Sequence, residues 1–142
     1  IIATFSLFSA LSGLAFGLIV RKITIRFSLF SAALCLAFSS TIMIFISVPW
    51  QGYLAAAFFG TGIGGILTIL PIAYADFFGR TSFGAIRGVA LFFQVTAQAS
   101  GPLMSGVLRD FSGDYYRSLI IFVVFSISAL IISLFAIPPK FK

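Results

Sequence analysis

Two amide side chains, Gln94 and Gln98, interrupt an otherwise apolar and uncharged run from Gly88 to Leu108. Their spacing places them on one face of a helix, together with Ala97 and Gly101. Burying an unpaired amide costs roughly 2–7 kcal/mol, so each amide must contact protein, water or a bound molecule. The pair therefore predicts one of two roles, either hydrogen bonds between helices or the binding of a solute.

The other polar residues do not form a catalytic or metal-binding pattern. The chain contains no histidine, and its three acids, Asp76, Asp110 and Asp114, lie at the ends of apolar runs or between them. Nucleophilic catalysis would need a base beside a serine or cysteine, and Cys35 lies within an apolar run, as a small hydrophobic residue does. We therefore expect no enzymatic activity, no metal and no cofactor.

The composition predicts a lipid bilayer as the surrounding medium. Hydrophobic residues make up 61% of the chain and charged residues only 8%, compared with about 25% charged in an ordinary soluble domain. A soluble fold of this composition would expose large apolar patches. The net charge of +6 is divided among short basic groups between uncharged runs, so no nucleic-acid partner is expected.

Charges and turn residues divide the chain into five segments that are each long enough to cross a membrane, which takes about 20 apolar residues. The segments are 1–20, 27–47, 53–75, 88–108 and 118–137, and a turn is predicted at Val48–Gly52. Their apolar runs do not alternate with polar residues, and a backbone in lipid must bond internally. The predicted fold class is all-α, a polytopic bundle of transmembrane helices.

Small and hydroxyl-bearing residues mark faces of these segments. Gly60 and Gly64 form a small-xxx-small pair, which lets two helix backbones approach closely. This pattern is explained either by tight packing alone or by a thin face that permits sliding or lines a cavity. Further polar faces are formed by Ser6 and Ser9 on the first segment and by Thr61, Gly65 and Thr68 on the third.

The basic residues predict an orientation. Seven of the nine fall on one side of the segments, namely Arg21, Lys22, Arg26, Arg80, Arg87, Lys140 and Lys142. The positive-inside rule places that side, with the C-terminus, in the cytoplasm. Ile1 is then outside, and an odd number of segments beginning outside leads us to expect further sequence upstream. Asp76 and Arg80, four residues apart, are expected to form either an interfacial ion pair or a gate.

The segment Phe77–Gly88 (FFGRTSFGAIRG) resembles the cytoplasmic loop between helices ten and eleven of major facilitator superfamily transporters. It is most similar to the branch of monocarboxylate and oxalate–formate transporters. Asp110, Gly113 and Tyr115 are similar to the residues that lead into the last helix of that family.

Two superfamily motifs add to the resemblance. The spacing of small residues and proline on the fourth segment is similar to the glycine-rich motif C, with Ala97 and Ser105 in place of glycines, at Gly88, Ala97, Gly101, Pro102 and Gly106. Gly17, Lys22 and Arg26 are similar in spacing to the loop motif A. Arg21 replaces the acidic residue of that motif, so its charge relay is not implied here.

The resemblance implies that the five segments are helices eight to twelve of a twelve-helix secondary transporter of the cell membrane, plasma or inner. The N-terminal helices of the same transporter and a small-molecule substrate are the implied partners. Helices eight, ten and eleven would line the central cavity, with Ser9, Thr61 and Gln98 near its midplane. The oxalate branch holds anions with basic residues in helices eight and eleven, and the corresponding segments here have none.

A second interpretation remains open, in which the chain is a non-transporting multi-span scaffold or assembly subunit. Its glycine faces would then pack against partner proteins instead of lining a path.

The predicted orientation can be tested with single cysteines in a Cys35→Ala background. Trp50→Cys and Asp114→Cys should react with a membrane-impermeant thiol reagent in intact cells, and Lys142→Cys should react only after permeabilisation, because basic loops stay in the cytoplasm. Labelling at position 142 but not at 114 would reverse the orientation.

Overall fold

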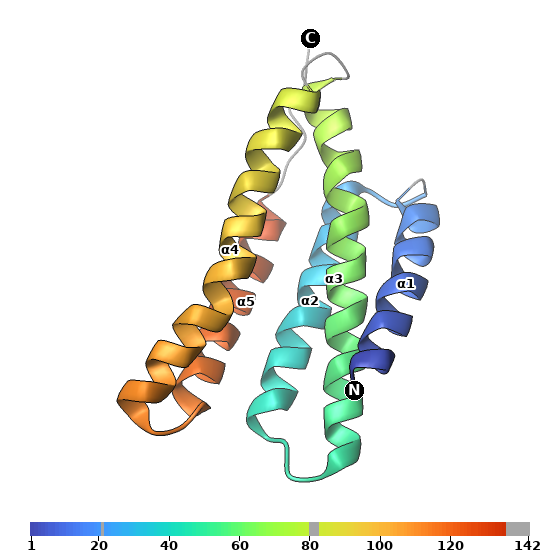
Figure 1. The fold of residues 1–142 in the computed structure, drawn as a ribbon. Helices are drawn as coiled ribbons and strands as arrows, with labels where there is room; N and C mark the ends of the chain where they lie inside the picture. Colours follow the sequence, from blue (N-terminus) through green and yellow to red (C-terminus); the bar gives the residue numbers. More distant parts are fainter. Residues whose placement is uncertain (21, 80–82, 136–142) are drawn as a thin grey trace.

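The computed structural model describes residues 1–20, 22–79 and 83–135, and over these it contains five α-helices and no strand (Figure 1). This confirms the all-α prediction. The helices are α1 (Ile2–Ile19), α2 (Ile25–Ile44), α3 (Pro49–Phe78), α4 (Phe83–Ser112) and α5 (Tyr116–Leu134). The α2–α3 and α4–α5 connections lie at the same end of the bundle, as expected for helices that cross in alternating directions (Figure 1).

Four of these helices, α1, α2, α3 and α5, are long and apolar enough to cross a membrane. The chain is accordingly an integral, multi-pass membrane protein. α4 has the same length as α3, 30 residues, but Gln94, Gln98 and several hydroxyl-bearing residues make it less apolar. The crossing predicted for 88–108 therefore stays a prediction.

Small residues occupy the interior of the bundle, and large apolar residues cover its exterior. Apart from Phe16 and Ile69, the buried hydrophobic residues are alanines. Leu14, Leu18 and Phe125 are among many large side chains that are mostly exposed. In water this distribution would favour aggregation, whereas in lipid it places the bulky side chains against the hydrocarbon.

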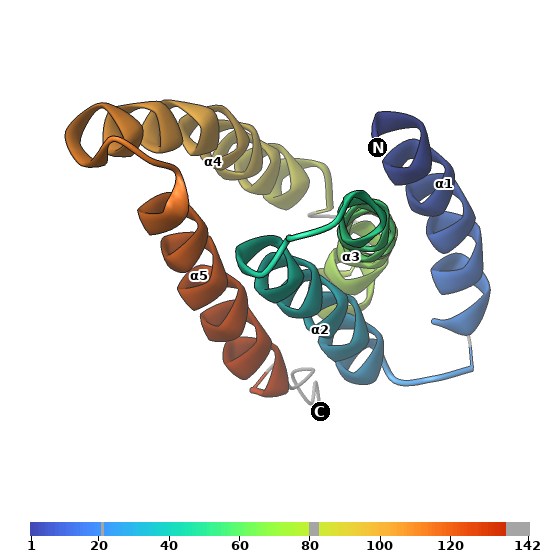
Figure 2. The same cartoon turned by 90° about the horizontal axis from the view of Figure 1, so that it is seen from below.

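α3 packs closely against α1 and α2, which lie on different sides of it (Figures 1 and 2). On the α1 side, a Cβ atom added to Gly60 would overlap the backbone carbonyl of Phe5, and one added to Gly64 would overlap that of Ser9. Neither backbone can move without shifting a whole helix. The glycines at these two positions therefore set the distance between α1 and α3.

Two further glycines of α3 allow a similarly close approach. A Cβ at Gly62 would lie 2.6 Å from Leu36 Cγ of α2, whereas one at Gly65 would meet both neighbouring helices, at 2.8 Å from Phe16 Cε2 of α1 and 3.1 Å from Ala32 Cβ of α2. Hydrogen bonds supplement this packing. The buried Ser39 hydroxyl donates to the carbonyl of Ala55 across the α2–α3 contact at 2.8 Å.

The predicted turn at Val48–Gly52 is wrong in its C-terminal part, because α3 already begins at Pro49. Proline suits the first helical position, since its ring fixes φ and the missing N–H would be unpaired there anyway. The side-chain oxygen of Gln51 accepts hydrogen bonds from the backbone N–H groups of Ser47 and Val48, at 2.7 and 3.3 Å. These bonds cap the start of the helix.

Glycines with positive φ follow α3 and α4. Gly79 has a φ of 75° and Gly113 a φ of 79°, a conformation that glycine adopts without steric cost. The Gly113 N–H donates to the carbonyl of Arg109 at 2.7 Å, so the chain turns sharply into α5. Pro71 and Pro102, by contrast, lie inside helices that continue past them.

Gly64→Ala should destabilise the protein by about 1–3 kcal/mol, because the added methyl group meets the α1 backbone. Gly88→Ala is the matched control, since nothing lies within 4 Å of its added Cβ. It should stabilise α4 by up to about 1 kcal/mol through helix propensity. The free energy of unfolding in mixed micelles, followed by circular dichroism, measures both effects, and stabilisation by Gly64→Ala would contradict the close α1–α3 contact.

Candidate solute-binding pocket

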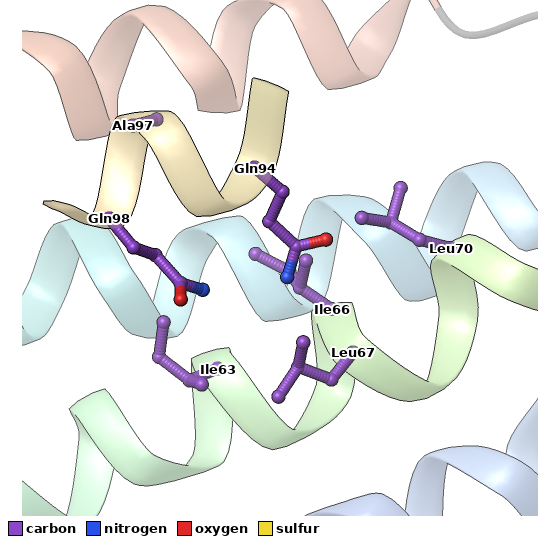
Figure 3. A pocket seen from close by; sticks show the side chains of 7 residues that line it. All are labelled: Ile63, Ile66, Leu67, Leu70, Gln94, Ala97 and Gln98. Carbon is purple, nitrogen blue, oxygen red and sulfur yellow. The ribbon is translucent and has the colours of Figure 1, made fainter. Parts of the chain in front are cut away.

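A pocket of about 330 Å³ lies between α3 and α4. Its volume falls within the range of roughly 300–1,000 Å³ that is typical of small-molecule sites. Figure 3 shows the side chains of Gln94 and Gln98 extending from α4 toward α3. The pocket is lined by Ile63, Ile66, Leu67, Leu70, Gln94, Ala97 and Gln98.

Helical spacing explains why these residues meet. The four α3 residues follow one another at intervals of three, one and three, and therefore form one apolar face. Gln94 and Gln98 form the opposing face on α4, as their spacing of four predicts. The pocket thus has an apolar wall on one side and two amides on the other.

Both amides are available to a ligand. Gln94 is half-buried and Gln98 is exposed, and neither side chain forms a hydrogen bond with any residue that the structure describes. Each amide offers an N–H₂ donor and a carbonyl acceptor. The residues lining the pocket carry no charge, so recognition there depends on hydrogen bonds and apolar contact.

The other residues predicted to line the substrate path lie elsewhere. Thr61 and Thr68 donate hydrogen bonds to carbonyls of their own helix, at 2.8 and 2.9 Å. Thr68 also packs on α1, where its hydroxyl lies 3.3 Å from a Cβ built at Gly13. A threonine that bonds within its helix needs no polar cavity, so its polarity did not predict which way it faces.

The remaining path candidates are likewise absent from this pocket. Ser9 is half-buried, with its backbone against the glycines of α3, and Gly65 is buried against Phe16. Ser6 is exposed and does not line the pocket. Conversely, the sequence did not indicate the α3 wall of the pocket, because Ile63 and Leu67 have the same local pattern as residues that face lipid.

The small residues of α4 have few neighbours. Nothing within the described residues lies within 4 Å of a Cβ built at Gly88, Gly101 or Gly106. Ala97 lines the pocket, and Pro102 is exposed. α4 therefore packs more loosely than α1, α2 and α3 do on one another.

The residues assigned to the cytoplasmic loops lie at helix ends. Lys22, Asp76 and Arg87 are exposed, and Arg26 is half-buried. The Arg87 guanidinium lies 5.7 Å from the centre of the Phe83 ring.

Two glycines were assigned to the same loops, Gly17 and Gly79. A Cβ at Gly17 would lie 3.6 Å from Thr68 Cγ2, so this glycine faces α3. Gly79 adopts the positive φ noted above. Arg21, Arg80, Lys140 and Lys142 lie outside the described residues, and the expected Asp76–Arg80 pair lies there with them.

A second cavity, of about 910 Å³, lies nearer the end of the bundle that holds the α2–α3 and α4–α5 connections. All five helices contribute to its wall, which is mainly apolar and uncharged. Three of its serine hydroxyls bond within the protein: Ser40 and Ser126 share a hydrogen bond of 3.1 Å, and Ser118 donates to the carbonyl of Ser105 at 3.5 Å.

Comparison of the chain with protein-family models, with curated proteins and with solved structures gave no match.

Proposed function

We propose that the chain forms part of the C-terminal helix bundle of a secondary transporter, of the major facilitator type that its motifs resemble, and moves a small solute by alternating access. The α3–α4 pocket is the proposed part of the substrate path. The single observation that carries this proposal is the pair of amides, which form no hydrogen bond with any described residue and face an apolar wall across a pocket of ligand size. Interhelical hydrogen bonds, the other role considered for this pair, are not formed with any described residue.

The depth of the pocket supports the proposal. Gln98 lies 15 residues after Phe83 and 14 before Ser112, and Ile63 is similarly central in α3, 14 residues after Pro49 and 15 before Phe78. Transporter substrates bind near the middle of the bilayer, between helices that change their packing. α4, which is the more loosely packed wall of the pocket, is the helix that we expect to move.

The lining limits the solute. Two amides supply donors and acceptors, and no charged side chain lines the pocket. The pocket by itself thus favours a small uncharged molecule with hydrogen-bonding groups. Recognition of an anion would need basic residues on the N-terminal helices that the resemblance implies. The proposed setting is the plasma or inner membrane, with the C-terminus in the cytoplasm.

The scaffold interpretation is favoured by a different observation, the open small-residue face of α4 at Gly88, Gly101 and Gly106. Such a face allows another helix to approach closely. A scaffold would bind a partner through this face and would catalyse no uptake, so the uptake assay separates the two functions.

Gln98→Leu in the complete protein should reduce uptake by about 5- to 150-fold, the equivalent of the roughly 1–3 kcal/mol lost when a polar group of the bound solute has no partner. Thr96→Val is the matched control, because the Thr96 hydroxyl bonds to Phe92 of its own helix at 2.7 Å and does not line the pocket. Uptake into proteoliposomes of a panel of neutral and charged solutes, normalised to the amount of protein, measures the effect. Normal uptake by Gln98→Leu, together with failure of Gln94→Leu to accumulate, would identify the amides as structural.

Residues 1–142 expressed alone should insert into the membrane but should not transport. Alternating access needs two helical repeats that rock against each other, and α4 has an open face to which further helices would pack. Uptake into proteoliposomes that contain only this chain measures the outcome. Saturable, substrate-specific uptake would instead indicate a small carrier that assembles from copies of this chain.

A further inference from the structure

The pocket and the second cavity are lined by the same face of α3. Gly52, Ala56 and Phe59 line the second cavity, and Ile63, Ile66 and Leu70 line the pocket. Successive members of this series are separated by four, three, four, three and four residues, the spacing of a single helix face. The two cavities therefore follow each other along α3 without a change of face.

α4 repeats this arrangement on the opposite side. Gln94 and Gln98 line the pocket, and Ser105 lines the second cavity, seven residues after Gln98. Seven residues correspond to about two helical turns, so the three side chains also share one face. Two facing helices thus present matching faces to both cavities.

Phe59 lies at the boundary between them. On α3 it is the last residue of the second cavity, and Ile63, about one turn further on, is the first residue of the pocket. The α3 residues before it in the cavity wall are small, at Gly52, Ala55 and Ala56. The Phe59 ring lies 5.8 Å from the ring of Phe5 on α1, centre to centre, and Phe5 also lines the second cavity.

We propose that the two cavities are consecutive sections of one solute path and that the side chain of Phe59 divides them. This inference rests on the proposed function, which supplies the molecule that moves along the path: a small uncharged solute with hydrogen-bonding groups. The solute enters the second cavity near the Trp50 end, passes Phe59 when its ring turns aside, and reaches the amide of Gln98. Both sections lack charged lining residues, which agrees with passage of one uncharged molecule through both.

The test measures access to position 98. In the complete protein with Cys35→Ala and Gln98→Cys, a water-soluble thiol reagent is added from the Trp50 side and its rate of reaction is measured. If the path is open only in a minor conformation of the protein, populated to about 10% or less, the reagent reaches position 98 only during that fraction of the time, and the reaction is slow. Phe59→Ala removes the ring and should raise the rate by about tenfold or more.

Phe58→Ala is the matched control. Phe58 is the adjacent residue and is exposed to nearly the same extent, 39% against 41% for Phe59. Its ring also pairs with a ring on another helix, that of Phe38 at 6.1 Å. It lines neither cavity, so Phe58→Ala should leave the rate unchanged.

An unchanged rate of reaction in Phe59→Ala would overturn the proposal. An equal rise of the rate in Phe58→Ala would also overturn it, because it would reflect general loosening of α3. The assay does not require transport. If Phe59→Ala raises the rate while Gln98→Leu transports normally, the connected path is supported and the role of the amide is rejected. If Gln98→Leu abolishes uptake while Phe59→Ala leaves the rate unchanged, the proposed function is supported and this path is rejected.

Discussion

Hydrocarbon offers no hydrogen-bond partner to a peptide group, and every backbone N–H and C=O inside a bilayer must therefore bond within the protein. This requirement explains how a chain rich in β-branched and aromatic residues folds as five helices. It also governs the hydroxyl groups. Thr61 and Thr68 donate to carbonyls of their own helix, and Ser39 donates to α3. These hydroxyl groups are thus satisfied within the protein, whereas the amides of Gln94 and Gln98 form no hydrogen bond with any described residue.

The same medium changes what holds helices together. Lipid is as apolar as leucine, so burying large side chains between helices gains little, and close backbone contact contributes more. α3 meets this requirement through Gly60 and Gly64 toward α1, through Gly62 toward α2, and through Gly65 toward both helices. Its remaining face carries Ile63 and Leu67 and borders the pocket. One helix therefore combines two tightly packed sides with one open side, and the cavities lie on the open side.

The sequence predicts only those features of this arrangement that depend on a single helix. The spacing of Gln94 and Gln98 predicts a shared face, and the apolar runs predict the helices. The pocket wall depends on two helices, and an isoleucine facing a cavity has the same local pattern as one facing lipid. The polarity of Thr61 and Thr68 does not indicate which way they face, because a hydroxyl can bond within its own turn. The start of α3 was misplaced because proline favours both turns and the first position of a helix.

The length of α3 and α4 has a further consequence. Each has 30 residues, which corresponds to about 45 Å at 1.5 Å per residue, whereas the hydrocarbon core of a bilayer is about 30 Å thick. Helices longer than the membrane tilt, or extend into the headgroup layer, by an amount that depends on the thickness of the lipid. Because α3 and α4 both contribute to the walls of the two cavities, a change of tilt alters the angle at which these walls cross. Membrane thickness thus becomes a variable that acts on the shape of the cavities.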